Sequence, residues 1–167
     1  MKRYIAIGIA VILIAGCDQT TPGPTETGQI KTQDNVLSKP ASDTVDAFHA
    51  ALAAGDTKQA LALLADDVLI YESGGAEKSK AEYASHHLEA DMAFLKGVKQ
   101  SAVAHSAQVH GDVAWVMNQG KTVGTYKDKA VDSASTETMV LRRINGDWKI
   151  VHIHWSSAEN KPKAPAS

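Results

Sequence analysis

Two groups of polar side chains in this sequence have the residue types and spacing that chemistry at a site requires. The first is His87 and Asp91, which are one helical turn apart, so that on a helix their side chains would share a face. A carboxylate that orients an imidazole prepares the ring to accept and donate protons. We therefore expect His87 and Asp91 to form a catalytic acid–base pair, with the alternative that the pair only satisfies itself and anchors its helix.

The second group lies on an expected hairpin near the end of the chain. His152 and His154 alternate, so on a strand both imidazoles would point to the same side. The Asn145-Gly146 pair predicts a two-residue turn that fixes the register of the hairpin. In that register Glu137 lies opposite His154. Two imidazoles beside a carboxylate suit zinc or copper, with Glu137 as a third ligand or as an acceptor for a ligating ring.

We expect the two groups to converge on one cavity, because a polar helix face and a polar strand face that are both buried need partners. The expected metal ligands, for zinc or copper, are His87, Asp91, His152 and His154. The expected cavity lining is Tyr71, His87, Asp91, Trp115, Glu137, His152 and His154. Of the other histidines, His49 and His110 are expected to face solvent, and His105 to lie in the core or at the rim of the cavity.

The elements that carry these groups follow from capping residues and from the spacing of apolar residues. Capping signals predict helices that begin at Asp43, Asp56 and Ser79, the last of which runs to about Leu95. After Gly97 the pattern changes to alternation, which predicts paired antiparallel strands. Helices followed by a run of strands indicate an α+β fold, with the helices packed on one face of a strongly curved antiparallel sheet.

The two ends of the chain differ in character from this domain. Lys2-Arg3, an apolar run and then Ile14-Ala15-Gly16-Cys17 resemble a bacterial lipoprotein signal, which predicts a signal peptide over residues 1–16 and a lipid on the thiol of Cys17. All five prolines lie in the flanks, so we expect a flexible linker over residues 17–42, a single domain over 43–157 and a disordered tail over 158–167. The expected location is the bacterial cell envelope, lipid-anchored to the bilayer and facing the periplasm.

The overall composition excludes several classes of protein. The chain has 167 residues, of which 44% are hydrophobic, and this suits one globular domain. Its 17 basic and 19 acidic residues give a net charge of −2, so it lacks the basic surface of a nucleic-acid-binding protein. A single cysteine excludes an internal disulfide.

The closing hairpin also resembles a known family. The segment Gly146–Ser156, which follows Glu137–Arg142, is similar to the last hairpin of SnoaL-like domains in the nuclear transport factor 2-like superfamily. Ala53–Asp56 and Leu64–Val68 are similar to the start of such a domain, so the resemblance covers nearly all of residues 43–157. It implies a cystatin-like cone of curved sheet around a long helix, a pocket at the wide end and frequent homodimers. No residue set here matches a named enzyme of the family, so the resemblance assigns no catalytic residue.

Three functions remain open at this point. The first is a membrane-tethered protein that binds a small molecule or a transition metal in the pocket. The second is an isomerase or dehydratase in which His87 and Asp91 move protons on a small carbonyl compound. The third is a homodimeric interaction domain with a vestigial pocket, whose exposed sheet face includes Val151, Ile153 and Trp155.

Overall fold

The computed structural model describes residues 27–160 and describes side chains from residue 37 onward. The expected signal peptide, Cys17 and residues 161–167 of the expected tail lie outside this range. The elements are α1 (Thr27–Ala54), α2 (Thr57–Leu63), β1 (Leu64–Glu72), β2 (Gly75–Glu77), α3 (Lys80–His86), α4 (Leu88–Gly97), β3 (Val98–His110), β4 (Val113–Tyr126), β5 (Lys129–Ile144) and β6 (Asp147–Glu159). Among the described helices, none is long and apolar enough to cross a membrane.

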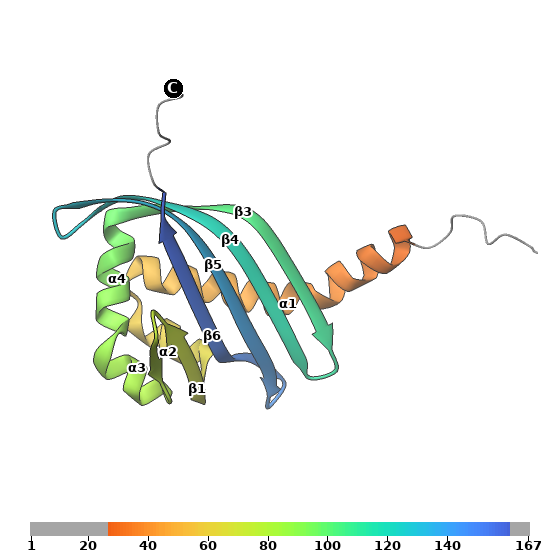
Figure 1. Cartoon of the computed structure of the whole chain (residues 1–167). Coiled ribbons are helices and arrows are strands. Elements are labelled where there is room, and N and C mark those ends of the chain that lie inside the picture. The colour runs from red at the N-terminus through yellow and green to blue at the C-terminus, as the bar shows by residue number, and fades with distance from the viewer. Residues whose placement is uncertain (1–26, 161–167) are drawn as a thin grey trace, which may run out of the picture.

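The six strands form one curved sheet in the order β2-β1-β6-β5-β4-β3. In Figure 1 the strands β3 to β6 lie side by side and bend strongly, α1 crosses one face of the sheet, and α3 and α4 follow one another at its side. The α+β fold with helices on one face is therefore confirmed. Two details differ from the expectation: β1 runs parallel to β6, and β6 continues to Glu159, past the expected boundary at residue 157.

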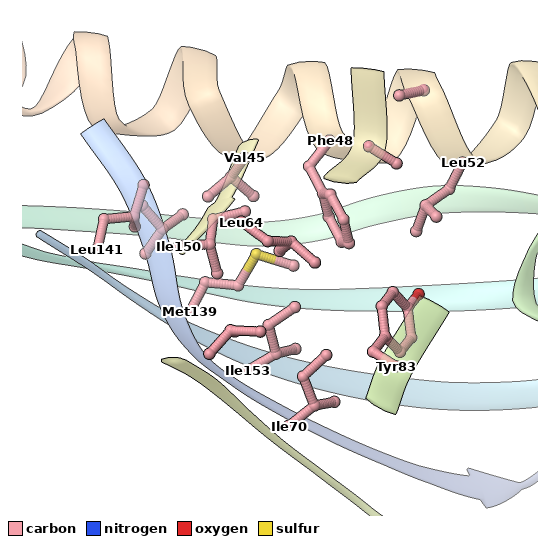
Figure 2. Packing of buried hydrophobic residues seen from close by; sticks show 14 of the residues in the cluster. Val45, Phe48, Leu52, Leu64, Ile70, Tyr83, Met139, Leu141, Ile150 and Ile153 are labelled. Carbon is pink, nitrogen blue, oxygen red and sulfur yellow. The ribbon is translucent and has the colours of Figure 1, made fainter. Parts of the chain in front are cut away.

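The core lies between α1 and the inner face of the sheet. Val45, Phe48 and Leu52 recur on α1 at helical spacing, and each is at most 2% exposed. Figure 2 shows these side chains pointing toward the strands, where Met139 and Ile153 are fully buried. Because each large apolar side chain stabilises the fold by about 1.5–3 kcal/mol when buried, this contact fixes α1 across the sheet. The remaining residues on the same side of α1 must then face the sheet as well.

The last hairpin begins in the expected register and then departs from it. Leu141 lies opposite Ile150, as a two-residue turn requires, but the next pair is Val140 with His152. Val151 is therefore an extra residue on β6. Such a bulge reverses which side chains of the strand point to each face of the sheet.

The bulge overturns the expected face of β6. Glu137 lies opposite Trp155 instead of His154. Ile153 is fully buried in the core, while His152 and His154 point to the outer face of the sheet. The expectation that Ile153 and Trp155 form an exposed face for a dimer is therefore wrong.

The helix α1 begins before the expected start at Asp43. It runs from Thr27 through Pro40, so most of the expected flexible linker is helical. A proline inside a helix removes a backbone donor and crowds the preceding turn. For this reason the sequence pattern favours a helix that begins only after Pro40. In the structure Ser38 is 3% exposed and Ala41 is fully buried. Packing against the sheet thus extends the domain to at least Ser38.

The expected helix from Ser79 to Leu95 is divided into α3 and α4. Ser79 caps α3 as expected, and its hydroxyl accepts a hydrogen bond from the backbone N–H of Glu82. His87 stands at the division with φ −107° and ψ −27°, and α4 begins at the next residue. The prediction that His87 shares a helix face with Asp91 assumed one continuous helix, so it does not hold.

Candidate functional site

A cavity of about 520 Å³ opens between α1, α4 and the inner face of the sheet. Its size is typical of pockets that bind small molecules. The titratable residues that line it are Asp46, His49, Glu72, Asp91, His105 and Glu137. Two of these, Asp91 and Glu137, were expected from the sequence, and they come from different groups. The cavity therefore joins one residue of the helix group to one residue of the strand group.

Glu137 on β5 is the centre of the polar wall of this cavity. Its side chain is only 11% exposed. The Oε2 atom accepts hydrogen bonds from His49 Nε2 at 2.8 Å and from Trp155 Nε1 at 2.7 Å. The Oε1 atom accepts one from Asn118 Nδ2 at 2.8 Å. A buried carboxylate with three donors is stable in its charged form.

The pKa values of Glu137 and His49 shift in opposite directions. Burial alone would raise the pKa of Glu137, but the hydrogen bond and charge of His49, together with the other two donors, bring it below its ordinary value. Burial alone would lower the pKa of His49, but the hydrogen bond and charge of Glu137 raise it above its ordinary value. Both shifts favour the charged forms, so His49 and Glu137 are arranged as an ion pair in the wall of the cavity.

A chain of hydrogen bonds extends from Glu137 to the start of the domain. Asn118 donates to Glu137, and its Oδ1 atom lies 2.7 Å from His105 Nδ1. Since an amide oxygen only accepts, His105 carries its proton on Nδ1. His105 Nε2 then accepts from Ser42 Oγ at 3.2 Å. This chain fixes the orientation of Asn118 and so of the Glu137 carboxylate.

Asp91 on α4 supplies the second functional group of the cavity. Tyr83 on α3 donates a hydrogen bond from its hydroxyl to Asp91 Oδ2 at 2.7 Å. Burial raises the pKa of Asp91 above its ordinary value, although the Tyr83 hydrogen bond and the His87 charge act against that rise. Glu72, also on the cavity, has a raised pKa because of burial and the Asp91 charge. A carboxylate with a raised pKa is a stronger base than an exposed one.

His87 does not form the expected pair with Asp91. Its Nδ1 atom pairs with Glu77 Oε1, and 60% of its side chain is exposed. Asp91 instead accepts from Tyr83. Because α3 ends just before His87, the imidazole turns toward β2 and away from the cavity, whose lining does not include it.

The other expected lining residues lie on the outer face of the sheet. His152 Nδ1 hydrogen-bonds the carbonyl of Leu69 at 2.8 Å, and the ring meets Tyr71 edge to face at 5.3 Å. Trp115 stacks on His110 with ring centres 5.1 Å apart. These positions follow from the bulge on β6 and from strand alternation, which separate Tyr71, Trp115, His152 and His154 from the cavity.

The expected zinc or copper site is not assembled. The four expected ligands, His87, Asp91, His152 and His154, lie on different sides of the sheet or point away from each other. Within the part of the chain that the structure describes, no group of three or more histidine, cysteine, aspartate or glutamate side chains is arranged to hold a metal ion.

Sequence reasoning missed His49, although a signal for it was present. His49 was expected to face solvent, yet it follows Phe48 and stands at helical spacing from Val45 and Leu52. The positions i, i+3, i+4 and i+7 form one face of a helix, and His49 occupies the i+4 position of that buried face. Tyr83 could have been found in the same way, as a buried aromatic hydroxyl that requires a partner.

Known proteins resemble this chain in sequence and fold. The SnoaL-like domain family matches residues 41–159. A protein from Shewanella frigidimarina named a putative ketosteroid isomerase is 43% identical, with a TM-score of 0.68, and the match covers 70% of this chain and 94% of that one. None of the curated proteins matches.

Two further solved structures share the fold. A putative dehydratase of the nuclear transport factor 2-like family from Streptomyces avermitilis is 20% identical, with a TM-score of 0.64, over 75% of this chain and 99% of that one. A nuclear transport factor 2-like protein with a cystatin-like fold, from Novosphingobium aromaticivorans, is 15% identical, with a TM-score of 0.61, over 86% and 95%. The match to residues 41–159 and the 43% identity establish that this chain belongs to the SnoaL-like domain family.

Proposed function

We propose that this chain binds a small carbonyl compound in the cavity and moves a proton within it, as an isomerase does. One observation carries the proposal: a carboxylate, Asp91, and an imidazole, His49, each with a raised pKa, line the same cavity. Both pKa values are raised, and the effect differs with the type of group: a carboxylate of raised pKa is a stronger base, and an imidazole of raised pKa holds its proton more firmly. Asp91 is then the base, and His49 is the hydrogen-bond donor.

Asp91 takes a proton from the carbon next to the substrate carbonyl. The electrons of that C–H bond form a C=C bond, and the carbonyl π electrons move to its oxygen. Tyr83 holds the Asp91 carboxylate in place through its hydroxyl and does not ionise, because burial and the Asp91 charge raise the Tyr83 pKa. The protonated Asp91 then returns the proton to another carbon that shares the electrons of the enolate. This is the γ carbon where the substrate has a conjugated C=C bond, and the carbonyl then re-forms from the oxyanion. It is the former carbonyl carbon where the α carbon carries a hydroxyl, whose proton moves to the oxyanion as that hydroxyl becomes the new carbonyl; no co-reactant is consumed in either case.

His49 stabilises the negative charge that develops on the substrate oxygen. Its Nε2–H is directed to Glu137, which leaves Nδ1–H for the substrate. Glu137 keeps the ring protonated, and the network behind Glu137 keeps it oriented before the substrate arrives. A donor of this kind, when removed from other enzymes, typically costs a factor of about 10²–10³ in rate.

The comparison with the Shewanella frigidimarina protein supports an isomerase-type function. That protein is named a putative ketosteroid isomerase, and this chain covers 94% of its length. The alternative function for this pocket is binding of a small molecule without turnover. The Asp91 and His49 arrangement favours catalysis, because a pocket that only binds has no need for a carboxylate of raised pKa.

The test is exchange of carbon-bound protons in D₂O, followed by NMR on a panel of small carbonyl compounds with the wild-type chain. Asp91→Asn should lower the exchange rate by at least about 100-fold for a lost catalytic base. Glu89→Gln, the same kind of change at an exposed position of α4, is the matched control and should have no effect. The rate should rise with pH around a midpoint above 3.8, the ordinary pKa of an aspartate. Exchange that does not depend on Asp91 would refute the assignment of the base.

We also propose that a lipid on Cys17 anchors the chain in the bacterial envelope. The support is the order of charge, apolar run, small residues and cysteine at the start of the sequence. Intact-mass spectrometry of the chain from bacterial membranes should give a mass that begins at Cys17 and includes acyl chains. A Cys17→Ser variant should appear in the soluble fraction. A chain cleaved at another residue and without lipid would contradict the proposal.

A further inference from the structure

The inner face of the sheet changes at Glu137 from apolar side chains to side chains that carry hydroxyl groups. On one side of it, Met139 and Leu141 are fully buried in the apolar core. On the other side, the same face of β5 carries Ser135 and Ser133, and both line the cavity. Alternate residues of a strand share a face, so this is one continuous row. The cavity therefore extends over hydroxyl groups where the core has methyl groups.

The neighbouring strands continue this hydroxyl surface. Ser135 lies between Gly120 on β4 and Ser157 on β6, and Ser133 lies opposite Thr122. A Cβ atom at Gly120 would stand 3.2 Å from Ser135 Oγ, so the missing side chain leaves that hydroxyl uncovered. All of these residues belong to the cavity lining.

Thr122 is the most informative residue of this surface. It is only 3% exposed, it points to the inner face and it lines the cavity. Among the described residues, the buried side-chain polar atom without a hydrogen-bond partner is Trp148 Nε1, so the Thr122 hydroxyl is not sealed in the core. It belongs to the wall of the cavity, on the same face of the same strand as Asn118. A hydroxyl that is open to the cavity can hydrogen-bond a ligand, whereas valine, which has the same shape, cannot.

We propose that the cavity takes a small carbonyl compound that carries several hydroxyl groups, as a sugar does. This inference rests on the proposed function, because it places the substrate carbonyl at His49. The substrate hydroxyls then lie over Thr122, Ser133 and Ser135. An apolar ring system of steroid type would cover these groups without replacing the hydrogen bonds that they make to water. The half-buried Trp155 indole, held by Glu137, provides a flat surface for the C–H groups of such a molecule.

The test compares two kinds of probe on the full chain by titration calorimetry. The first kind is ribose, fructose and dihydroxyacetone, and the second is androst-4-ene-3,17-dione. At least one hydroxylated probe should bind, and the steroid should not. Tight binding of the steroid, or binding of none of the hydroxylated probes, would overturn the proposal.

Two variants with nearly the same shape sharpen this test. Thr122→Val removes only the hydroxyl and should weaken the hydroxylated probe by about three- to tenfold, the loss of one hydrogen bond. Thr122→Ser keeps the hydroxyl and should bind within twofold of the wild type. Equal binding by Thr122→Val and Thr122→Ser would overturn the proposal. Ser135→Ala repeats the test on β5 in case Thr122→Val does not fold.

The outcomes separate this inference from the proposed function. Binding of a hydroxylated probe that is sensitive to Thr122→Val, without proton exchange in D₂O, would retain the ligand class and refute the isomerase. Exchange that depends on Asp91 and occurs on the steroid alone would retain the isomerase and refute the ligand class.

Discussion

Glu137→Gln removes one negative charge from the polar wall of the cavity with almost no change in shape. The amide that replaces the carboxylate has one oxygen and one NH₂ group. If the oxygen faces His49 and Trp155, then the NH₂ group faces the Asn118 donor that Oε1 accepts in the wild type. Asn118 cannot reverse to help, because its own oxygen accepts from His105. At least one N–H donor therefore faces another N–H donor and has no acceptor.

The expected cost follows from these contacts. A hydrogen bond to a charged group contributes about 1.5–3 kcal/mol, and breaking a buried ion pair costs about 3–5 kcal/mol. Glu137 is 11% exposed but His49 is 34% exposed, so solvent screens part of the pair. We expect Glu137→Gln to lower the free energy of unfolding by about 2–3 kcal/mol.

Urea unfolding followed by tryptophan fluorescence is the assay, since Trp155 contacts Glu137 directly. The Glu137 pKa is lowered in the fold, so its contribution is present above 4.5, the ordinary value, and is lost as pH falls through the folded value. The His49 pKa is raised, so its contribution is present below 6.5 and is lost as pH rises through the folded value. The cost of Glu137→Gln should therefore be greatest between these two ordinary values.

The exposed Glu89→Gln change on α4 is the control and should alter the free energy of unfolding by no more than about 0.5 kcal/mol. The reasoning would be refuted if Glu137→Gln were as stable as the wild type near pH 5.5. It would also fail if the difference between the two proteins grew steadily as the pH fell to 3.

Three other predictions test the surroundings of the site. Tyr83→Phe removes the donor to Asp91, so the pKa of Asp91 should rise further in a ¹³C NMR titration, and a fall would contradict the hydrogen bond. Ser79→Ala removes the cap of α3, whose hydroxyl accepts from Glu82 N, and should cost about 1 kcal/mol in urea unfolding, whereas no change would mean that the cap is replaced. Asn145→Ala removes the short polar side chain that helps asparagine to adopt the left-handed φ of 54°, and should cost about 1 kcal/mol by the same assay, with Asn145→Gly close to neutral.

The hairpin shows how far local rules reach in this chain. The Asn145-Gly146 turn is confirmed by positive φ at both residues, and Leu141 lies opposite Ile150 as the turn requires. The extra residue at Val151 has no signal in the sequence, because it is neither glycine nor flanked by a break in the apolar pattern. Periodicity continues through a bulge while the direction of every later side chain reverses. An error of one residue therefore moved both histidines of the His-x-His pair to the outer face.

The two site residues that were expected on one helix have different positions in the structure for a related reason. Asp91 was expected on the buried face and does line the cavity, while His87, only one turn before it, does not. The break between α3 and α4 at His87 separates them, and no proline or glycine marks it in the sequence. On α1 the helix is continuous, and the spacing from Val45 and Leu52 does put His49 on the buried face, so the expectation that His49 faces solvent departed from the periodicity and was wrong. Periodicity was reliable here wherever the element had no interruption.

Glu137 illustrates what spacing alone could and could not provide. A carboxylate that alternates with Met139 and Leu141 on a buried strand face must have partners, so its importance follows from the sequence. The identity of those partners does not, because they come from α1, β4 and β6, which meet only when the sheet bends around the long helix. The curvature that brings these elements together also opens the cavity beside them. The ion pair and the cavity are thus two results of one packing arrangement, so a change that straightens the sheet should weaken both together.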